Sequence, residues 1–214
     1  MLYEIVIPNT MRTIEAILFD LDGVLINSFE SWYHAFNEML RAYGKEEIGR
    51  AEFREKCWGP DLEHNLADLN LGEEAGKYCI NEQLKLIGLI ELFPGVKEVL
   101  GRVREEYKLK VGLVTNTPKE NVRAIFEHFQ LSNHFDVIVT GDDVKNGKPN
   151  AEMVVAACEK LTLKPENVIL VGDTEIDFQA GKSAGCAIVG VRAKPEGGER
   201  IDTLFELFPL LPLH

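Results

Sequence analysis

The 214-residue chain has too little positive charge for a protein that binds nucleic acid or an anionic membrane surface. Lysine and arginine number 23 against 35 aspartates and glutamates, which gives a formal net charge of −12, whereas both partners are bound through basic surfaces. No apolar run approaches the roughly 20 residues of a transmembrane helix, and the first ten residues lack the basic start of a secretory signal. We therefore expect a cytoplasmic protein with neither nucleic acid nor membrane as partner.

Cysteine is scarce and scattered as well. Cys57, Cys79, Cys158 and Cys186 form no CxxC pair and have no accompanying histidine pattern, which argues against zinc and favours reduced thiols in the core. Hydrophobic residues make up 45% of the chain and charged residues 27%, values typical of a globular protein. The length suits one α/β domain with a modest insertion.

Short apolar runs that alternate with helix-length segments predict the fold class. Runs of this kind are typical of central parallel strands covered on both faces, so we expect an α/β protein with a doubly wound parallel sheet. Helices should begin at Thr117, followed by Pro118 and Glu120, and at Asn150, because these residues suit N-terminal caps. The predicted strands are residues 14–19, 111–115, 137–140, 167–172 and 187–191.

The region between the first two strands has helical periodicity and no convincing strand. Three apolar stripes with three- and four-residue steps indicate packed helices. We predict an α/β core made of residues 1–25 and 92–214 and an inserted all-helical cap of residues 26–91; residues 1 to 10 are either an additional edge strand or a tail. The stripes are Phe29, Trp32, Tyr33, Phe36, Leu40 and Tyr43, then Leu62, Leu66 and Leu69, then Ile80, Leu84 and Ile87.

Two acids, Asp20 and Asp22, directly follow the first predicted strand. Residues two apart lie on one side of a strand, so both carboxylates can address one ligand, and Gly23 permits a sharp turn after them. A metal site, a nucleophile with a general acid, and a solvated turn all fit this motif taken alone.

Other strand ends carry polar residues too. Thr115 and Asn116 follow the second strand at a predicted helix N-terminus, where backbone N–H groups suit phosphate oxygens. Lys148 lies in a short loop after the third strand, and Asp173 and Asp177 follow the fourth. Each has an ordinary alternative: capping for the threonines, solvation for the lysine, and favourable acids at a helix N-terminus for the last pair.

Taken in order, these four strand ends resemble the four motifs of the haloacid dehalogenase-like superfamily. The resemblance extends from about residue 14 onward, and it is nearest to the phosphoglycolate phosphatase and β-phosphoglucomutase branch, which has a helical cap between the first and second motifs. VTGDDVKNGKPNAE and VGDTEIDFQAGKSAG carry it most clearly. Two features depart from the branch's usual pattern, at positions outside the expected catalytic set: Asn27 stands where the branch often has aspartate, and the stretch Lys148-Pro149-Asn150-Ala151 lacks a second proline often found there.

The resemblance implies a Rossmann-like core and a role for each motif residue. Asp20 would be the nucleophile that forms an aspartyl-phosphate, and Asp22 the general acid and base. Lys148 would neutralise charge at the phosphoryl group, whose oxygens Thr115 and Asn116 would bind. Mg²⁺ would be held by Asp20, the backbone carbonyl of Asp22 and Asp173, with Asp177 behind these ligands.

The chemistry of phosphoryl transfer supports this division of labour. A carboxylate and a phosphate ester repel each other, so attack requires cations nearby, and an alkoxide leaving group requires a proton. The acid at Asp22 therefore argues against a dehalogenase, whose halide leaves unprotonated. In the cap, Trp58 could shape the substrate pocket and Arg54 or Lys56 could meet a substrate carboxylate, although tryptophans are more often core and lysines surface.

The expected function is a Mg²⁺-dependent phosphatase that acts on a small phosphorylated metabolite resembling phosphoglycolate. The alternatives are a phosphomutase of the β-phosphoglucomutase type and a non-catalytic aspartate phospho-acceptor or regulatory relative. The chain is expected to be a monomer or a homodimer, because the apolar ending FELFPLLPLH suits docking either on its own core or on a second subunit.

Overall fold

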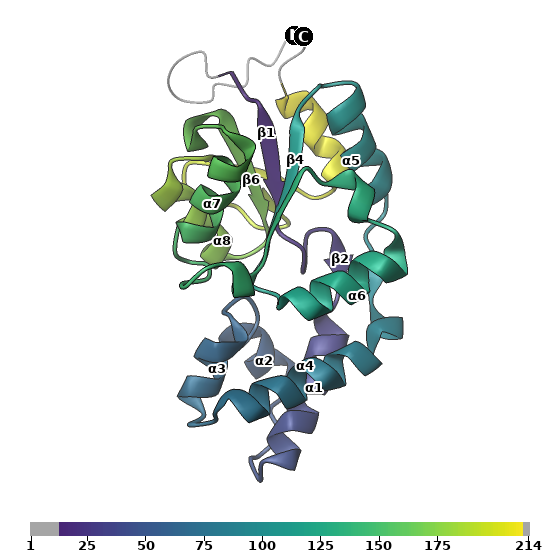
Figure 1. Cartoon of the computed structure of the whole chain (residues 1–214), viewed down its shortest axis with the longest axis vertical. Coiled ribbons are helices and arrows are strands. Elements are labelled where there is room, and N and C mark those ends of the chain that lie inside the picture. The colour runs from purple at the N-terminus through teal and green to yellow at the C-terminus, as the bar shows by residue number, and fades with distance from the viewer. Residues whose placement is uncertain (1–12, 212–214) are drawn as a thin grey trace.

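The core of the molecule is a six-stranded parallel sheet, described by a computed structural model for residues 13–211. The expectation for residues 1 to 10 lies outside the described residues. The strand order is β5-β4-β1-β6-β7-β8 (Figure 1). All five predicted strands are present and the fold class is confirmed, whereas β8 was not predicted. The strands are β1 (Ala16–Phe19), β4 (Lys110–Val114), β5 (Val137–Val139), β6 (Val168–Gly172), β7 (Ala187–Val191) and β8 (Glu199–Ile201).

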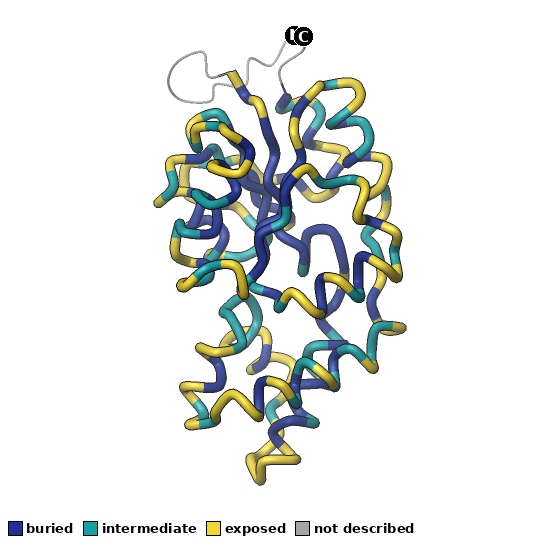
Figure 2. Tube along the Cα trace, viewed as in Figure 1, coloured by how far each residue is buried: buried dark blue, intermediate teal, exposed yellow. Residues whose placement is uncertain are grey.

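Helices cover both faces of the sheet because its strands alternate two apolar faces. Ile17 and Phe19 of β1 belong to a cluster with α5 (Val96–Glu105) and α6 (Lys119–Phe129). Ala16 and Leu18 belong to the opposite cluster, with α7 (Glu152–Leu161) and α8 (Glu175–Ala184). Figure 2 shows the central strands buried between helices whose outer faces are exposed.

The strand order reverses at β1. The chain leaves β4 for the edge strand β5 and returns through α7 to β6, which pairs with the other side of β1. In open α/β sheets, ligands bind beyond the carboxyl ends of the strands at such a switch point. Asp20 is the first residue after β1.

A group of four helices with its own apolar cluster lies at the carboxyl end of the sheet (Figure 1). Two short antiparallel strands connect it to the core, with Ile26 paired to Leu92 and Asn27 to Glu91. The helical stripes therefore predicted helices where the structure has them, while the boundary 26–91 stays a prediction. The elements are β2 (Ile26–Asn27), α1 (Phe29–Ala42), α2 (Arg50–Lys56), α3 (Leu62–Asp68), α4 (Glu73–Lys85), η1 (Ile87–Leu89) and β3 (Glu91–Leu92).

The C-terminal segment packs on the core of its own chain. Leu207 and Leu211 are buried, and the Phe208 ring stacks on Tyr107 with centroids 5.5 Å apart. Because the apolar segment is covered by its own chain, it no longer gives a reason to expect a dimer. None of the described helices combines the length and apolar character needed to cross a membrane. The remaining short helices are η2 (Ser132–His134), η3 (Gly141–Asp143), η4 (Pro165–Asn167) and η5 (Leu204–Leu210).

Two predicted helix starts differ in detail. Helix α6 begins at Lys119 after Pro118, without a side-chain cap, because the Thr117 hydroxyl donates to Asp22 instead. The prediction that Thr117 caps this helix was therefore wrong. The Asn150 side chain does accept a hydrogen bond from the Glu152 N–H, at 2.9 Å, although α7 itself starts one residue later than predicted.

Candidate active site

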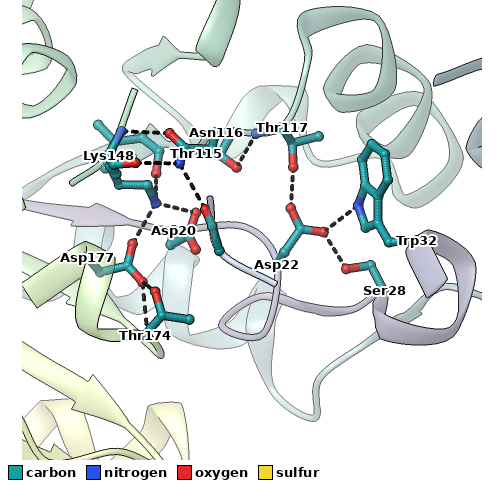
Figure 3. Close-up of polar contacts among 12 residues, drawn as sticks. Asp20, Asp22, Ser28, Trp32, Thr115, Asn116, Thr117, Lys148, Thr174 and Asp177 are labelled. Carbon is teal, nitrogen blue, oxygen red and sulfur yellow. Dashed lines mark hydrogen bonds and ion pairs between the residues drawn. The ribbon is translucent and has the colours of Figure 1, made fainter. Parts of the chain in front are cut away.

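Three polar residues stand at the carboxyl ends of adjacent strands. Asp20, Thr115 and Asp173 directly follow β1, β4 and β6. The backbone N–H of Asp20 donates to Val171 at 2.9 Å, which continues the sheet's hydrogen bonding by one residue and fixes the direction in which the side chain leaves. The sheet thus brings together groups that are far apart in sequence, and Figure 3 shows two of them, Asp20 and Thr115.

Lys148 is the cation of this group, and the structure buries it to 2% exposure. Its ammonium lies 2.7 Å from Asp20 and 2.6 Å from Asp177, and it donates to the Val114 carbonyl at 3.0 Å. These contacts occupy all three donors of the ammonium group. Burial disfavours the charge, but the two carboxylates outweigh that effect and hold the pKa of Lys148 above its ordinary value.

Asp177 supports Lys148 from the first turn of α8. One of its oxygens accepts from Lys148, and the other accepts from the Thr174 hydroxyl at 2.6 Å and the Thr174 N–H at 3.1 Å, forming a capping box. Gly172 lies against this carboxylate so closely that an added Cβ would come within 2.2 Å of the Asp177 Cβ. A glycine at the end of β6 is therefore required for this packing.

Asp22 lies apart from the lysine cluster and is held by three donors. One oxygen accepts from the Ser28 hydroxyl and from the Trp32 indole N–H, the latter at 3.2 Å, and the other accepts from the Thr117 hydroxyl. Figure 3 shows the carboxylate between Thr117 and Trp32. Burial raises the pKa of Asp22 above its ordinary value, while the three hydrogen bonds oppose that rise.

The carboxylates of Asp20, Asp173 and Asp177 offer oxygens that all lie within 4.8 Å of one another. Burial, which Lys148 opposes and the other acids reinforce, raises the pKa of Asp20 well above its ordinary value. Burial and then repulsion from Asp177 raise the pKa of Asp173 to about 7. With all three acids ionised, the group would hold more negative charge than Lys148 alone balances.

A divalent cation fits this set of donors. The Oδ1 atom of Asp173 is buried and has no hydrogen-bond partner, and Gly23, with φ of 76°, leaves open the space beside this carboxylate that a Cβ would fill at 2.1 Å from Oδ2. Hard carboxylate oxygens are the ligands that Mg²⁺ prefers. Asp20 and Asp173 are the residues suited to hold it, and the contribution of the Asp22 carbonyl stays a prediction.

The Asn116 side chain is occupied by the protein itself. Its amide nitrogen donates to the carbonyls of Lys148 and Gly59, both at 2.9 Å, and its oxygen accepts from the Lys148 N–H at 2.8 Å. Asn116 therefore links the lysine loop to the cap. The Thr115 hydroxyl accepts a hydrogen bond from the Thr117 N–H at 3.2 Å. Thr115 as a whole is 1% exposed.

Core and cap enclose a cavity of about 80 Å³ above these groups. Two tryptophans of the cap reach across it to core acids: Trp32 to Asp22, and Trp58 to Asp173. Trp58 is thus at the pocket as predicted from the cap loop, whereas Trp32 was predicted only as a packing residue. The other cap residues on the wall are Phe36, Phe53, Cys57, Gly59, Pro60, Leu62 and Asn65.

The cap's candidate cations lie elsewhere. The Arg54 guanidinium sits over the Phe29 ring, 4.1 Å from its centroid, and Lys56 pairs with Glu52 at 2.8 Å. Both are exposed, and neither lines the cavity. In this closed arrangement the structure does not bring them to the site where a substrate carboxylate was expected to meet them.

A buried polar contact also joins the cap to the core. Gln83 of α4 accepts from the Asn121 amide of α6 at 2.5 Å and donates to the Ser31 hydroxyl at 3.3 Å. Ser31 in turn donates to the Ser28 carbonyl at 2.8 Å, and Ser28 holds Asp22. All four of these linking residues are at most 1% exposed.

A protein-family model described as haloacid dehalogenase-like hydrolase matches residues 17–191, a span that includes every strand-end residue described above. The chain belongs to this family. The family match confirms the superfamily that the sequence motifs predicted.

Several named proteins resemble this hydrolase along most of their length. A phosphoglycolate phosphatase of Salmonella typhimurium is 38% identical, with 95% of this chain and 94% of that protein covered. A phosphorylated carbohydrates phosphatase of Thermotoga maritima is 33% identical, with 80% and 82% covered. The crystal structure of β-phosphoglucomutase from Clostridium difficile has a TM-score of 0.79 at 27% identity, with 91% and 93% covered. These matches confirm the predicted branch and the predicted enzyme class, a phosphatase.

Sequence reasoning missed the residues that hold Asp22. Trp32 was predicted as a packing residue of a helix and Thr117 as a helix cap, and Ser28 was given no role. The available signal was spacing: Ser28 and Trp32 lie four residues apart, on one side of α1, and α1 starts just after the Asp22 turn. Contacts of Thr117 with Asp22 depend on the pairing of β1 with β4.

Proposed function

We propose that this hydrolase is a Mg²⁺-dependent phosphatase that releases phosphate from a small phosphorylated metabolite through an aspartyl-phosphate on Asp20. One observation carries the proposal: a buried carboxylate 2.7 Å from a fully coordinated lysine lies next to a second acid held by separate donors. One acid is thus placed for attack and the other for proton transfer.

In the first step, an Asp20 carboxylate oxygen attacks phosphorus while the bond from phosphorus to the ester oxygen breaks. Lys148 neutralises charge beside the nucleophile, which reduces repulsion between the two anions. The leaving oxygen takes the proton of Asp22, whose raised pKa favours the protonated state that a general acid needs. The products are the aspartyl-phosphate and a free alcohol.

In the second step, the Asp22 carboxylate removes a proton from water as the water oxygen attacks phosphorus. The bond between phosphorus and Asp20 breaks, phosphate leaves, and both acids return to their starting states. Ser28, Trp32 and Thr117 hold Asp22 in place for both transfers. Asp20 and Asp173 would hold Mg²⁺, which when bound would supply positive charge that favours phosphoryl transfer.

The size of the cavity supports a small substrate. About 80 Å³ is well below the roughly 300–1,000 Å³ of sites for drug-sized ligands. The relatives act, by their names, on phosphoglycolate and on phosphorylated carbohydrates, and a phosphoglycolate-like metabolite is our starting proposal. We also propose a cytoplasmic location and a monomer or homodimer.

The test is phosphate release from a panel of phosphorylated metabolites, with Mg²⁺ and with chelator, for the native chain and for Asp20→Asn. We expect metal-dependent turnover, a phosphorylated protein detectable by mass spectrometry after rapid acid quench, and a loss of at least about 10³-fold in the variant. Substantial turnover by Asp20→Asn, or release that ignores chelator, contradicts the proposal.

A phosphomutase is the second candidate, favoured by the likeness to β-phosphoglucomutase. It would use the same acids but return the phosphoryl group to a sugar. Product analysis with a hexose phosphate distinguishes the two reactions, because a hydrolase releases free phosphate and a mutase yields an isomeric sugar phosphate.

A further inference from the structure

The cap half of the cavity wall has no charged side chain among the residues that the structure describes. It consists mainly of aromatic and aliphatic groups, and its thiol, Cys57, is kept neutral because burial raises its pKa to about 11. The arginine and the lysine of the neighbouring helix lie outside this wall. A ligand group that enters the cap half therefore meets no cation there.

Among residues 13–211, the core half supplies no spare cation to the lining either. Lys148 is the one basic residue of the lining, and its three donors are used by Asp20, Asp177 and a backbone carbonyl. Four carboxyl groups line the same cavity, Asp20, Asp22, Asp173 and Asp177, and two of them, Asp20 and Asp177, contact the ammonium. An additional anion on the leaving group would meet a cap wall that cannot replace its hydration.

The polar atoms of the cap wall are suited to a hydroxyl group. The Asn65 amide nitrogen donates one of its two hydrogens to the Cys57 carbonyl at 3.0 Å, so this side chain keeps its carbonyl oxygen as an acceptor, together with one remaining amide hydrogen. A neutral alcohol can donate to that oxygen, and its carbon atoms can pack on Trp58 and Phe36. A carboxylate has no proton to donate.

From this wall we infer that the leaving group is a small uncharged alcohol or polyol, and that a carboxylate on the leaving group is selected against. The inference rests on the proposed phosphatase function and narrows its substrate class. Of the two candidate substrate classes, it favours phosphorylated carbohydrates over phosphoglycolate itself. The residues that determine specificity are those of the cap wall. Among them, Leu62 supplies an uncharged surface and Asn65 supplies a hydrogen-bond acceptor.

The experiment compares two phosphate esters of the same length, 2-phosphoglycolate and 2-hydroxyethyl phosphate, which differ by a carboxylate in place of a CH₂OH group. Acetyl phosphate serves as a reference that needs no contact with the cap wall. We expect kcat/KM for 2-hydroxyethyl phosphate to exceed that for 2-phosphoglycolate by at least about tenfold. Equal values, or a preference for phosphoglycolate, overturn the inference.

A variant pair tests the cause. Leu62 lines the cavity and is only partly buried, so Leu62→Lys can place an ammonium there with its tip hydrated, while Leu62→Met keeps the size and the neutrality. The lysine should reduce the preference for the neutral ester by about tenfold, and the methionine should keep the native ratio. An unchanged ratio in a folded Leu62→Lys protein overturns the inference.

The native comparison stands by itself if the lysine variant fails to fold. Absence of phosphate release from all three compounds in Mg²⁺ contradicts the phosphatase proposal itself, and the inference fails with it. Turnover of acetyl phosphate together with a preference for phosphoglycolate contradicts the inference alone.

Discussion

The two walls of the cavity differ in the chemistry of their side chains: the core wall is charged and polar, and the cap wall is mainly apolar. The core wall consists of charged groups whose hydrogen bonds are almost all made within the protein, as with Lys148 and Asp177. The cap wall consists of rings and aliphatic groups, and it touches the core acids through the indoles of Trp32 and Trp58. The proposed reaction therefore rests on the core wall, and the inferred choice of leaving group rests on the cap wall.

The largest effect is expected from Lys148→Met, which breaks the core wall. The change leaves two buried carboxylates without their cation, and removing one partner of a buried ion pair costs about 3–5 kcal/mol. Turnover should fall by at least about 10³-fold. Urea denaturation and phosphate release measure both effects.

Lys145→Met is the matched control, because this lysine lies in the same loop and is exposed. Its denaturation midpoint and turnover should equal those of the native chain. A Lys148→Met protein as stable and active as this control would show that the buried ion pairs are unimportant.

A second prediction concerns Asp173→Asn and the metal. The Asp173 pKa of about 7 lies above its ordinary value of 3.8, so between these values the folded protein keeps a proton that the unfolded protein has lost. The stability of the metal-free protein should therefore fall as pH rises through this range, and the substitution should remove that loss.

At pH 8 without metal, Asp173→Asn should unfold about 2–4 °C higher than the native chain, which corresponds to about 1 kcal/mol. With Mg²⁺ the order should reverse, because the native chain gains stability by binding and the variant does not. Thermal unfolding in chelator and in Mg²⁺ measures both. A variant that Mg²⁺ stabilises as much as it does the native chain would remove Asp173 from the metal site.

A smaller effect is expected from Gln83→Leu, which breaks the polar contact between cap and core. The buried Asn121 amide would lose its 2.5 Å partner, and leaving such a group unsatisfied costs about 1–3 kcal/mol. Because Gln83 also connects through Ser31 to the residue that holds Asp22, kcat should fall more than KM rises.

The double variant Gln83→Leu with Asn121→Leu should recover part of the lost stability, since both polar partners are then replaced. Gln179→Leu on the exposed face of α8 is the control. Full additivity of the two changes would contradict a direct coupling between cap and core.

The smallest effect is expected from Arg54→Gln. Its guanidinium covers Phe29 on the outer side of the cap, so KM for both neutral and carboxylate-bearing esters should stay within about twofold of native. A rise confined to the carboxylate ester would place Arg54 in the substrate pocket and remove the contrast between the two walls.

The sequence allowed the core wall to be predicted far better than the cap wall. The strand-end acids and Lys148 stand in short motifs next to strongly apolar strands, so their meeting follows from the sheet alone. Strand β8 was not predicted because two of its three residues are exposed. Strands β2 and β3 were not predicted because two residues are too few to show any periodicity. The donors to Asp22 are Ser28 and Trp32, at the start of α1, and Thr117, which follows β4. Their convergence depends on how the cap packs and on the pairing of β1 with β4. For the same reason, the sequence could not tell that Arg54 turns toward Phe29.

The pairing of β2 with β3 has a consequence for how such a protein arises and folds. It brings Asn27 and Glu91 side by side, so the long segment between them starts and ends at one point on the core. Joining the two strands by a tight hairpin turn would preserve their register, and lengthening a closed loop changes the free energy of folding only slowly with its length. We therefore expect the sheet to fold as a unit that tolerates exchange of the inserted helices, so that new substrate preferences can evolve by replacing that segment while the catalytic sheet keeps its structure.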